Sequence, residues 1–207
     1  CFQRRFPGRR LRARLRACFR RWPSERAHDP AATVVGLILH LLLGFRKLRD
    51  SRYYRDDPMV HRVLGVHRLP DVATVSRILA AADGDDVAEL RHLCRQLVME
   101  RLGMLGLRRV TLDFDGSVIP TGRWAEGTAV GYNRAKKGQR SYYPLLCTVA
   151  QTGQVFDLHH RPGNVHDSNG AEDFIAACVE SMQQALPGVQ IEVRMDSAFF
   201  SDAIVSA

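Results

Sequence analysis

The first half of the chain carries apolar residues at the spacing of helices. A helix that is apolar on most sides is predicted from residue 31 to about residue 49, and Asp29 and Pro30 precede it. An aspartate followed by proline is typical of an N-cap and a first helical position. Asp57 and Pro58 repeat this pair, and they predict the start of a second, shorter helix.

Two further helices complete this half. Apolar residues recur every three or four positions over 72–82, and the segment 87–105 is amphipathic, with Leu90, Leu93, Leu97 and Val98 expected to face inward. Residues 83–86 (Asp-Gly-Asp-Asp) are predicted to form a loop between them. Together these patterns predict a helical N-terminal domain over residues 28–106.

The pattern changes from helical spacing to alternation after residue 108, and residues 107–207 form the second predicted domain. The predicted strands are 109–115, 142–150, 154–160 and 189–195. A helix capped by Ser168 or Asn169 separates the last two strands, with Glu172 offering a capping box, and residues 116–140 are predicted to form a long loop or a ragged hairpin. The order strand, strand, strand, helix, strand predicts a mixed sheet of the α+β or α/β class.

Carboxylates follow the first and the last of these strands. Asp113 and Asp115 lie two residues apart and therefore project from the same face, and Asp196 closes the last strand. Because chemistry gathers at the carboxyl ends of strands in such sheets, Asp115 and Asp196 meet if the two strands are neighbours. Carboxylate oxygens suit Mg²⁺ or Mn²⁺. The alternative is structural: one aspartate caps a turn at Gly116-Ser117 and the other forms an ion pair with Arg194.

Charge is distributed unevenly along the chain. The net charge is +8, but residues 1–28 contain ten arginines and one glutamate, so the remaining residues are close to neutral. Residues 1–27 are therefore predicted to form a basic, flexible or weakly helical arm suited to a polyanion. The longest apolar run, about 15 residues at 31–45, is shorter than the roughly 20 residues that a membrane span needs. The five cysteines are scattered, which favours reduced thiols in a cytoplasm.

One dense basic patch lies outside this arm. It is a loop of cations and amides that follows the acid pair, and such groups contact DNA phosphates. The candidate DNA-binding residues in it are Tyr132, Asn133, Arg134, Lys136, Lys137 and Arg140. Arg161, Asn164 and His166 are further polar groups that can reach a phosphate or the acids. A zinc site at His159, His160, His166 and Asp167 is not favoured, because adjacent histidines on a strand face opposite sides.

Several motifs, in this order, resemble bacterial insertion-sequence transposases of the DDE class. They are LDFDGS at 112–117, GYN at 131–133, KKG at 136–138, SYYPL at 141–145, RPGNVH at 161–166, SNGA at 168–171 and RMDSAFF at 194–200. Residues 48–58 and 69–77 also resemble an upstream segment of these proteins, so that the resemblance covers about residues 28–207. The arginine-rich arm lies outside it.

The resemblance implies an RNase-H-like catalytic core that holds two Mg²⁺ (or Mn²⁺) ions. It assigns Asp115 and Asp196 as catalytic residues and metal ligands, with Asp113 as an accessory acid. It further implies cleavage and strand transfer at the terminal inverted repeats of an insertion sequence, by a homo-oligomer on double-stranded DNA in the cytoplasm, with no membrane partner. The family's third acid, a glutamate, would lie beyond residue 207, so the chain is expected to be a truncated transposase with an incomplete sheet. The alternatives are an inactive DNA-binding derivative and a nuclease that joins no strands.

Overall fold

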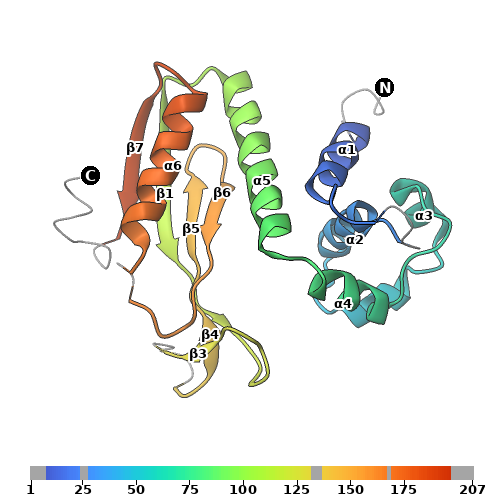
Figure 1. The fold of residues 1–207 in the computed structure, drawn as a ribbon. Helices are drawn as coiled ribbons and strands as arrows, with labels where there is room; N and C mark the ends of the chain where they lie inside the picture. Colours follow the sequence, from blue (N-terminus) through green and yellow to red (C-terminus); the bar gives the residue numbers. More distant parts are fainter. Residues whose placement is uncertain (1–7, 24–27, 132–136, 167–168, 197–207) are drawn as a thin grey trace. The chain divides into compact units, whose positions relative to one another are not determined.

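The chain divides into two compact units, residues 1–93 and residues 94–207, and each is described by itself. The computed structural model (Figure 1) describes residues 8–23, 28–131, 137–166 and 169–196. No helix in these ranges is long and apolar enough to cross a membrane.

The first unit is helical, as predicted. Its elements are α1 (Gly8–Cys18), α2 (Pro30–Leu42), the 3-10 helix η2 (Leu48–Tyr53), α3 (Pro58–Leu64), α4 (Val72–Ala80) and the beginning of α5 (Gly84–Leu105). Three aspartates cap these helices by accepting a hydrogen bond from a backbone N–H in the first turn: Asp29 from Ala31, Asp57 from Met59 and Asp71 from Thr74. The Asp-Pro pairs at α2 and α3 therefore act as their residue types predict.

Two boundaries and the burial of one helix differ from the prediction. Helix α2 ends at Leu42 instead of continuing to residue 49, and the chain turns at Gly44, whose φ of 86° suits glycine. Helix α5 starts at Gly84, inside the predicted loop, because Asp83 and Asp86 each accept a hydrogen bond from the other's backbone N–H. The predicted apolar face of α4 is not buried: Val72 is 37% and Leu79 is 46% exposed.

The arginine-rich segment was predicted to be a flexible or weakly helical arm, and its described residues, 8–23, contain a helix that packs against the rest of the unit. Leu15, Cys18 and Phe19 are buried, and they give α1 and the turn after it an apolar side. Arg12 donates a hydrogen bond to the carbonyl oxygen of Leu64 at 2.7 Å, and Arg16 pairs with Asp29 at 3.0 Å. Carboxylates and carbonyls of the same unit thus bind some of the arginines that the sequence pattern predicted to face a polyanion.

The second unit contains a four-stranded mixed sheet. Strands β1 (Arg109–Gly116), β5 (Leu145–Val149) and β6 (Gln154–His159) pair antiparallel, and β7 (Gln190–Met195) pairs parallel with β1, in the order β6-β5-β1-β7. Helix α6 (Ala171–Ala185) connects β6 to β7. This arrangement confirms the predicted α+β class with a mixed sheet. The predicted side-chain cap of α6 is absent, because Gly170 occupies its N-cap position.

One face of this sheet forms the core. Val110, Leu112 and Phe114 of β1 are buried, and Phe114 meets Phe174 of α6 edge-on at 5.9 Å between ring centres. The C-terminal half of α5 adds Val98 and Leu102 to the same cluster. Because side chains alternate along a strand, Thr111, Asp113 and Asp115 are left on the opposite face.

A second, small sheet replaces the predicted loop at 116–140. Its strands are β2 (Ile119–Pro120), β4 (Arg140–Tyr142) and β3 (Ala129–Val130), in the order β2-β4-β3. It extends beyond the carboxyl end of β1 (Figure 1). Tyr142, predicted at the start of the long second strand, belongs to β4, because Tyr143 and Pro144 separate it from β5.

The capping aspartate Asp86 provides a test of how the arginine-rich segment is attached. Its side chain is 2% exposed, and Oδ2 accepts hydrogen bonds from Trp22 Nε1 at 2.8 Å and from the Asp83 backbone. We expect Asp86→Ala to lower the free energy of unfolding of this unit by about 1–3 kcal/mol, because it leaves buried donors unsatisfied. Urea unfolding followed by Trp22 emission, in a Trp124→Phe background, measures the change.

The neighbouring Asp85 is the matched control. It pairs with Arg21 at the surface, with its side chain 76% exposed, so Asp85→Ala should leave the unfolding curve almost unchanged. Equal losses in the two variants would contradict the role given to Asp86.

Candidate active site

Two neighbouring strands position the candidate acids. In the parallel pairing of β1 with β7, Asp113 lies opposite Arg194 and Phe114 lies opposite Met195. One further step in this register places Asp115 opposite Asp196, at the carboxyl ends of both strands. The expectation that these two strands are neighbours is confirmed, although 81 residues separate the two aspartates in the sequence.

Asp113 forms an ion pair. Arg194 donates two hydrogen bonds to it, from Nε to Oδ1 at 2.6 Å and from a terminal nitrogen to Oδ2 at 2.7 Å. The hydrogen bond to Asp113 raises the pKa of Arg194 above its ordinary value. This is the structural alternative noted for the acid pair, and it engages both carboxylate oxygens that an accessory metal ligand would use.

Asp115 and Asp196 are both exposed at the end of the sheet. Their carboxylates supply hard oxygen donors of the kind that Mg²⁺ and Mn²⁺ prefer, and water supplies the other ligands in many Mg²⁺ sites. The donor set therefore fits a divalent cation. Within the described ranges, however, no group of three or more Asp, Glu, His or Cys side chains is placed to hold a metal.

The predicted basic patch is only partly described. Tyr132, Asn133, Arg134 and Lys136 lie outside the described residues. Lys137 is exposed. Arg140 instead turns inward: its guanidinium donates to the hydroxyl of Thr128 at 2.9 Å and to the carbonyl oxygen of the same residue.

Arg161 is a structural residue and not an exposed phosphate contact. It is 3% exposed, and its guanidinium donates hydrogen bonds to the carbonyl oxygens of Tyr143 at 3.1 Å, His166 at 3.3 Å and Asn169 at 2.9 Å. The guanidinium thus binds loop carbonyl groups that take part in no helix or β-sheet hydrogen bonding. Asn164 and His166, on the loop that Arg161 holds, are exposed. Nothing in the residue pattern distinguishes a buried loop arginine from an exposed one.

Two glycines bring the loop of Arg161 against the small sheet. A Cβ atom at Gly131 would collide with the carbonyl group of Gly163, and one at Gly163 would collide with Ser141 and come within 2.8 Å of the carbonyl oxygen of Ala129. Backbone contact this close requires glycine on both sides. The backbone at Gly131, just after β3, therefore packs directly against the backbone at Gly163, after β6.

The histidines and the buried cysteines do not form a catalytic centre. His159 stacks on Phe174 and His160 lies against Tyr142, on different elements, as expected for adjacent strand residues. Cys147 is fully buried, and a hydrogen bond with Cys178, together with burial, raises its pKa far above the ordinary value of a thiol. A thiol held in its protonated form is a poor nucleophile.

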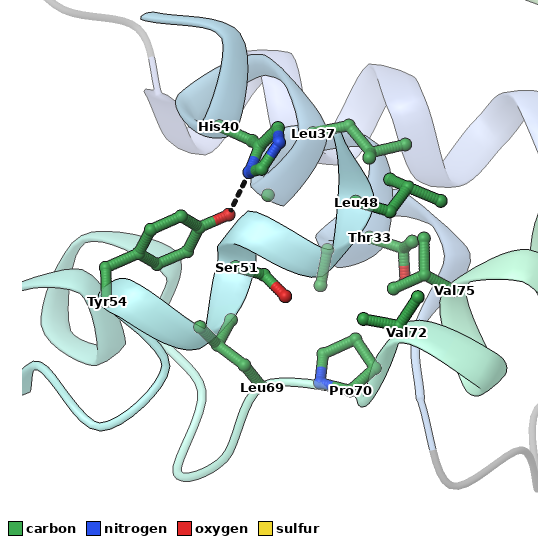
Figure 2. A pocket seen from close by; sticks show the side chains of 12 residues that line it. Thr33, Leu37, His40, Leu48, Ser51, Tyr54, Leu69, Pro70, Val72 and Val75 are labelled. Carbon is green, nitrogen blue, oxygen red and sulfur yellow. Dashed lines mark hydrogen bonds between the residues drawn. The ribbon is translucent and has the colours of Figure 1, made fainter. Parts of the chain in front are cut away.

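A small cavity lies in the first unit, between α2, η2 and α4 (Figure 2). Its volume is about 40 Å³, enough for a few water molecules. Mostly apolar side chains line it, and the buried His40 binds the Tyr54 hydroxyl through Nδ1 at 2.7 Å. Burial raises the pKa of Tyr54. The cavity is too small for a nucleotide, so it is a packing feature of this unit.

The role of Arg161 can be tested by replacement. We expect Arg161→Lys to lower the free energy of unfolding of the second unit by about 1–3 kcal/mol, because an ammonium group cannot reach three carbonyls set around a planar guanidinium. Urea unfolding followed by circular dichroism measures this loss. The exposed cation Lys137 is the control, and Lys137→Ala should leave stability unchanged. A stable Arg161→Lys protein would contradict the structural role.

The Asp113–Arg194 pair predicts competition with a metal ion. Arg194→Gln should strengthen Mg²⁺ binding several-fold in titration calorimetry, because it frees the Asp113 carboxylate beside the two exposed acids. Arg109→Gln is the control, since Arg109 pairs with Glu192 at the opposite end of the same two strands. Unchanged Mg²⁺ affinity in Arg194→Gln would show that Asp113 takes no part in metal binding.

Comparison with known proteins places this arrangement in a family. A family model described as "Transposase DDE domain group 1" matches residues 7–207, and this match includes α1. No curated protein matches the chain.

Among solved structures, the Mos1 transposase paired-end complex with left transposon end is similar at a TM-score of 0.34 and 11% identity, over 89% of this chain and 57% of that one. A pre-cleavage Mos1 transpososome is similar at a TM-score of 0.31 and 12% identity, over 96% of this chain and 74% of that one. The chain thus spans little more than half the length of the first of these proteins, and the assignment rests on the family model. With this match over almost its whole length, the chain belongs to the DDE transposases.

Proposed function

We propose that this chain supplies catalytic residues of a DNA transposase that cleaves the ends of an insertion sequence and joins them to target DNA. The observation that supports the proposal is the parallel β1–β7 register, which ends with Phe114 opposite Met195, one residue before Asp115 and Asp196. Membership of the DDE family supports a catalytic role for these two carboxylates. The setting is the cytoplasm of a bacterium, where an insertion sequence and its target share one compartment.

Asp115 and Asp196 would hold the divalent ions, two Mg²⁺ or Mn²⁺ in the complete site. When bound, such ions lower the pKa of a water nucleophile and stabilise the leaving oxygen in phosphoryl transfer. The two aspartates contribute fixed negative charge at the end of a rigid sheet, so little reorganisation is needed when the ions bind. A third acid from outside the described residues would complete the set. Asp113 would act on the ions only indirectly, because its carboxylate is paired with Arg194.

Exposed polar groups of the second unit would position double-stranded DNA. Lys137 supplies a cation, and Asn164 and His166 supply hydrogen-bonding groups on the neighbouring loop. Tyr132, Asn133, Arg134 and Lys136 would add to the same contact. Arg161 acts from within, since it holds the loop that presents Asn164 and His166. Arg140 holds the loop before β3 through Thr128. Such phosphate contacts fix the register of the duplex without reading its sequence. Two copies on paired transposon ends would form the active assembly.

A second candidate function is an inactive derivative that binds transposon ends without cutting them. One observation favours it: the described residues contain no cluster of three metal-ligating side chains. In that case the chain would bind duplex DNA in a strongly salt-dependent manner. It would show no metal-dependent nicking.

Replacing the acids tests both functions in one experiment. The protein in its full encoded length is incubated with Mg²⁺ and a duplex that carries the inverted repeats flanking its gene. We expect Asp115→Asn and Asp196→Asn to reduce strand cleavage to background, because each removes a charge that a divalent ion requires, while duplex binding in a mobility-shift assay stays within about twofold.

Asp173→Asn is the matched control, since Asp173 is an exposed acid on the first turn of α6. It should cleave like the parent. Cleavage that persists in either acid variant would remove Asp115 or Asp196 from the catalytic set. Duplex binding without cleavage in the parent protein would favour the inactive derivative.

A further inference from the structure

The 3-10 helix η2 divides its side chains between two sides. A 3-10 helix has three residues per turn, so side chains three positions apart lie above one another. Leu48, Ser51 and Tyr54 form one such row and line the cavity between α2, η2 and α4 (Figure 2). Arg49 and Arg52 form the next row, and both are exposed. The helix therefore has an inward side that packs and an outward side that is basic.

The basic side continues before the helix begins. Residues 46–55 contain five basic residues and one acidic residue. Arg46 repeats the three-residue spacing before Arg49, and it is also exposed. Arg55 repeats it at the other end, but its side chain pairs with a neighbouring carboxylate at 3.8 Å. Arg46, Arg49 and Arg52 are therefore taken together as the η2 row.

Aromatic contacts hold the backbone of this segment in place. Phe45 stacks on Tyr53 at 5.8 Å between ring centres, and it contacts the ring of the buried His40 at 5.4 Å. His40 in turn binds the Tyr54 hydroxyl. The guanidinium of Arg52 lies over the exposed ring of Tyr53, 5.0 Å from its centre. The cations thus extend from a well-held backbone, which lowers the entropy lost when they bind a ligand.

The spacing of the η2 row suits phosphates. The rise of a 3-10 helix places Arg49 and Arg52 about 6 Å apart along the helix axis. Each strand of duplex DNA carries one phosphate per about 3.4 Å of its axis, so the two cations can reach separate phosphates of one backbone. Arginine also presents its donors in a planar fork that matches phosphate oxygens. Unlike the buried Arg161, both side chains are exposed to solvent.

We propose that the η2 row binds the phosphate backbone of duplex DNA independently of base sequence, in addition to the contacts proposed for the second unit. This inference rests on the proposed function, since it gives the same DNA substrate a further contact in the helical unit. Phosphate contacts position a duplex but do not read its bases. The row would therefore act on any duplex that the protein holds, whether an insertion-sequence end or target DNA.

The salt dependence of duplex binding tests the η2 row. The full chain is titrated into a fluorescently labelled duplex of random sequence at several salt concentrations between about 50 and 200 mM, and anisotropy reports binding. We expect the double variant Arg49→Gln/Arg52→Gln to reduce the slope of log affinity against log salt concentration by about 2, because it removes two phosphate contacts. Arg49→Lys/Arg52→Lys should keep most of the slope, because both charges remain. An unchanged slope in the glutamine variant would overturn the inference.

The matched control removes the same charge elsewhere in the helical unit. Arg62 and Arg68 are exposed and lie outside the η2 row, so Arg62→Gln/Arg68→Gln should leave the slope almost unchanged. Circular dichroism should show both double variants folded like the parent, because all four side chains are exposed. Equal changes of slope in the two variants would contradict a contact at η2. A change seen only with a duplex that carries the inverted repeats would contradict sequence independence.

Vesicles that contain phosphatidylserine test a lipid surface as the other anionic partner. If Arg49→Gln/Arg52→Gln lost vesicle binding but kept the slope of the parent on DNA, the proposal would be wrong. Cleavage by the parent, with an unchanged slope in this variant, would leave the transposase function intact and reject only the η2 contact. A reduced slope in a protein whose parent never cleaves would retain the η2 contact and reject the catalytic function.

Discussion

The parallel pairing of β1 with β7 is the contact on which the arrangement of the second unit depends. It unites segments far apart in the sequence, aligns their carboxyl ends and determines which side chains share a face. In this register Asp113 lies opposite Arg194, and the two side chains form a bidentate ion pair between the strands. A slip by one residue would move Asp113 away from Arg194 and turn the acids toward the core side, so polar pairing and apolar burial favour the same alignment.

Arginines serve architecture as much as binding in this chain. Arg12, Arg140 and Arg161 each donate to backbone carbonyls that no strand or helix partner satisfies. A guanidinium has five donors in one plane, so one side chain can organise a loop that would otherwise need several residues. The net charge of the protein therefore overstates the charge that DNA would meet. The glycine contact between the segments after β3 and β6 adds rigidity where side chains would not fit.

Local signals made most elements predictable. Asp-Pro pairs marked the starts of α2 and α3, and alternation marked β1, β5, β6 and β7, because these signals act over a few residues. The pairing of Asp113 with Arg194 was one of two alternatives that the residue types allowed. The sequence pattern failed where distant partners decide: α1 is packed because Leu15 and Phe19 find a buried site, and Arg161 is internal because three carbonyls surround it. Two-residue strands such as β2 and β3 are too short to show a period.

The long separation between β1 and β7 has a consequence for the protein during its synthesis. The ribosome must add 81 residues after Asp115 before Asp196 exists, and β7 can join the sheet only after β5, β6 and α6 have emerged. Closing so large a loop is slow compared with forming the hairpin of β5 and β6. The acid pair is therefore among the last features of the sheet to form. A nascent chain attached to its ribosome can fold a helical unit and a hairpin long before both proposed catalytic aspartates are present.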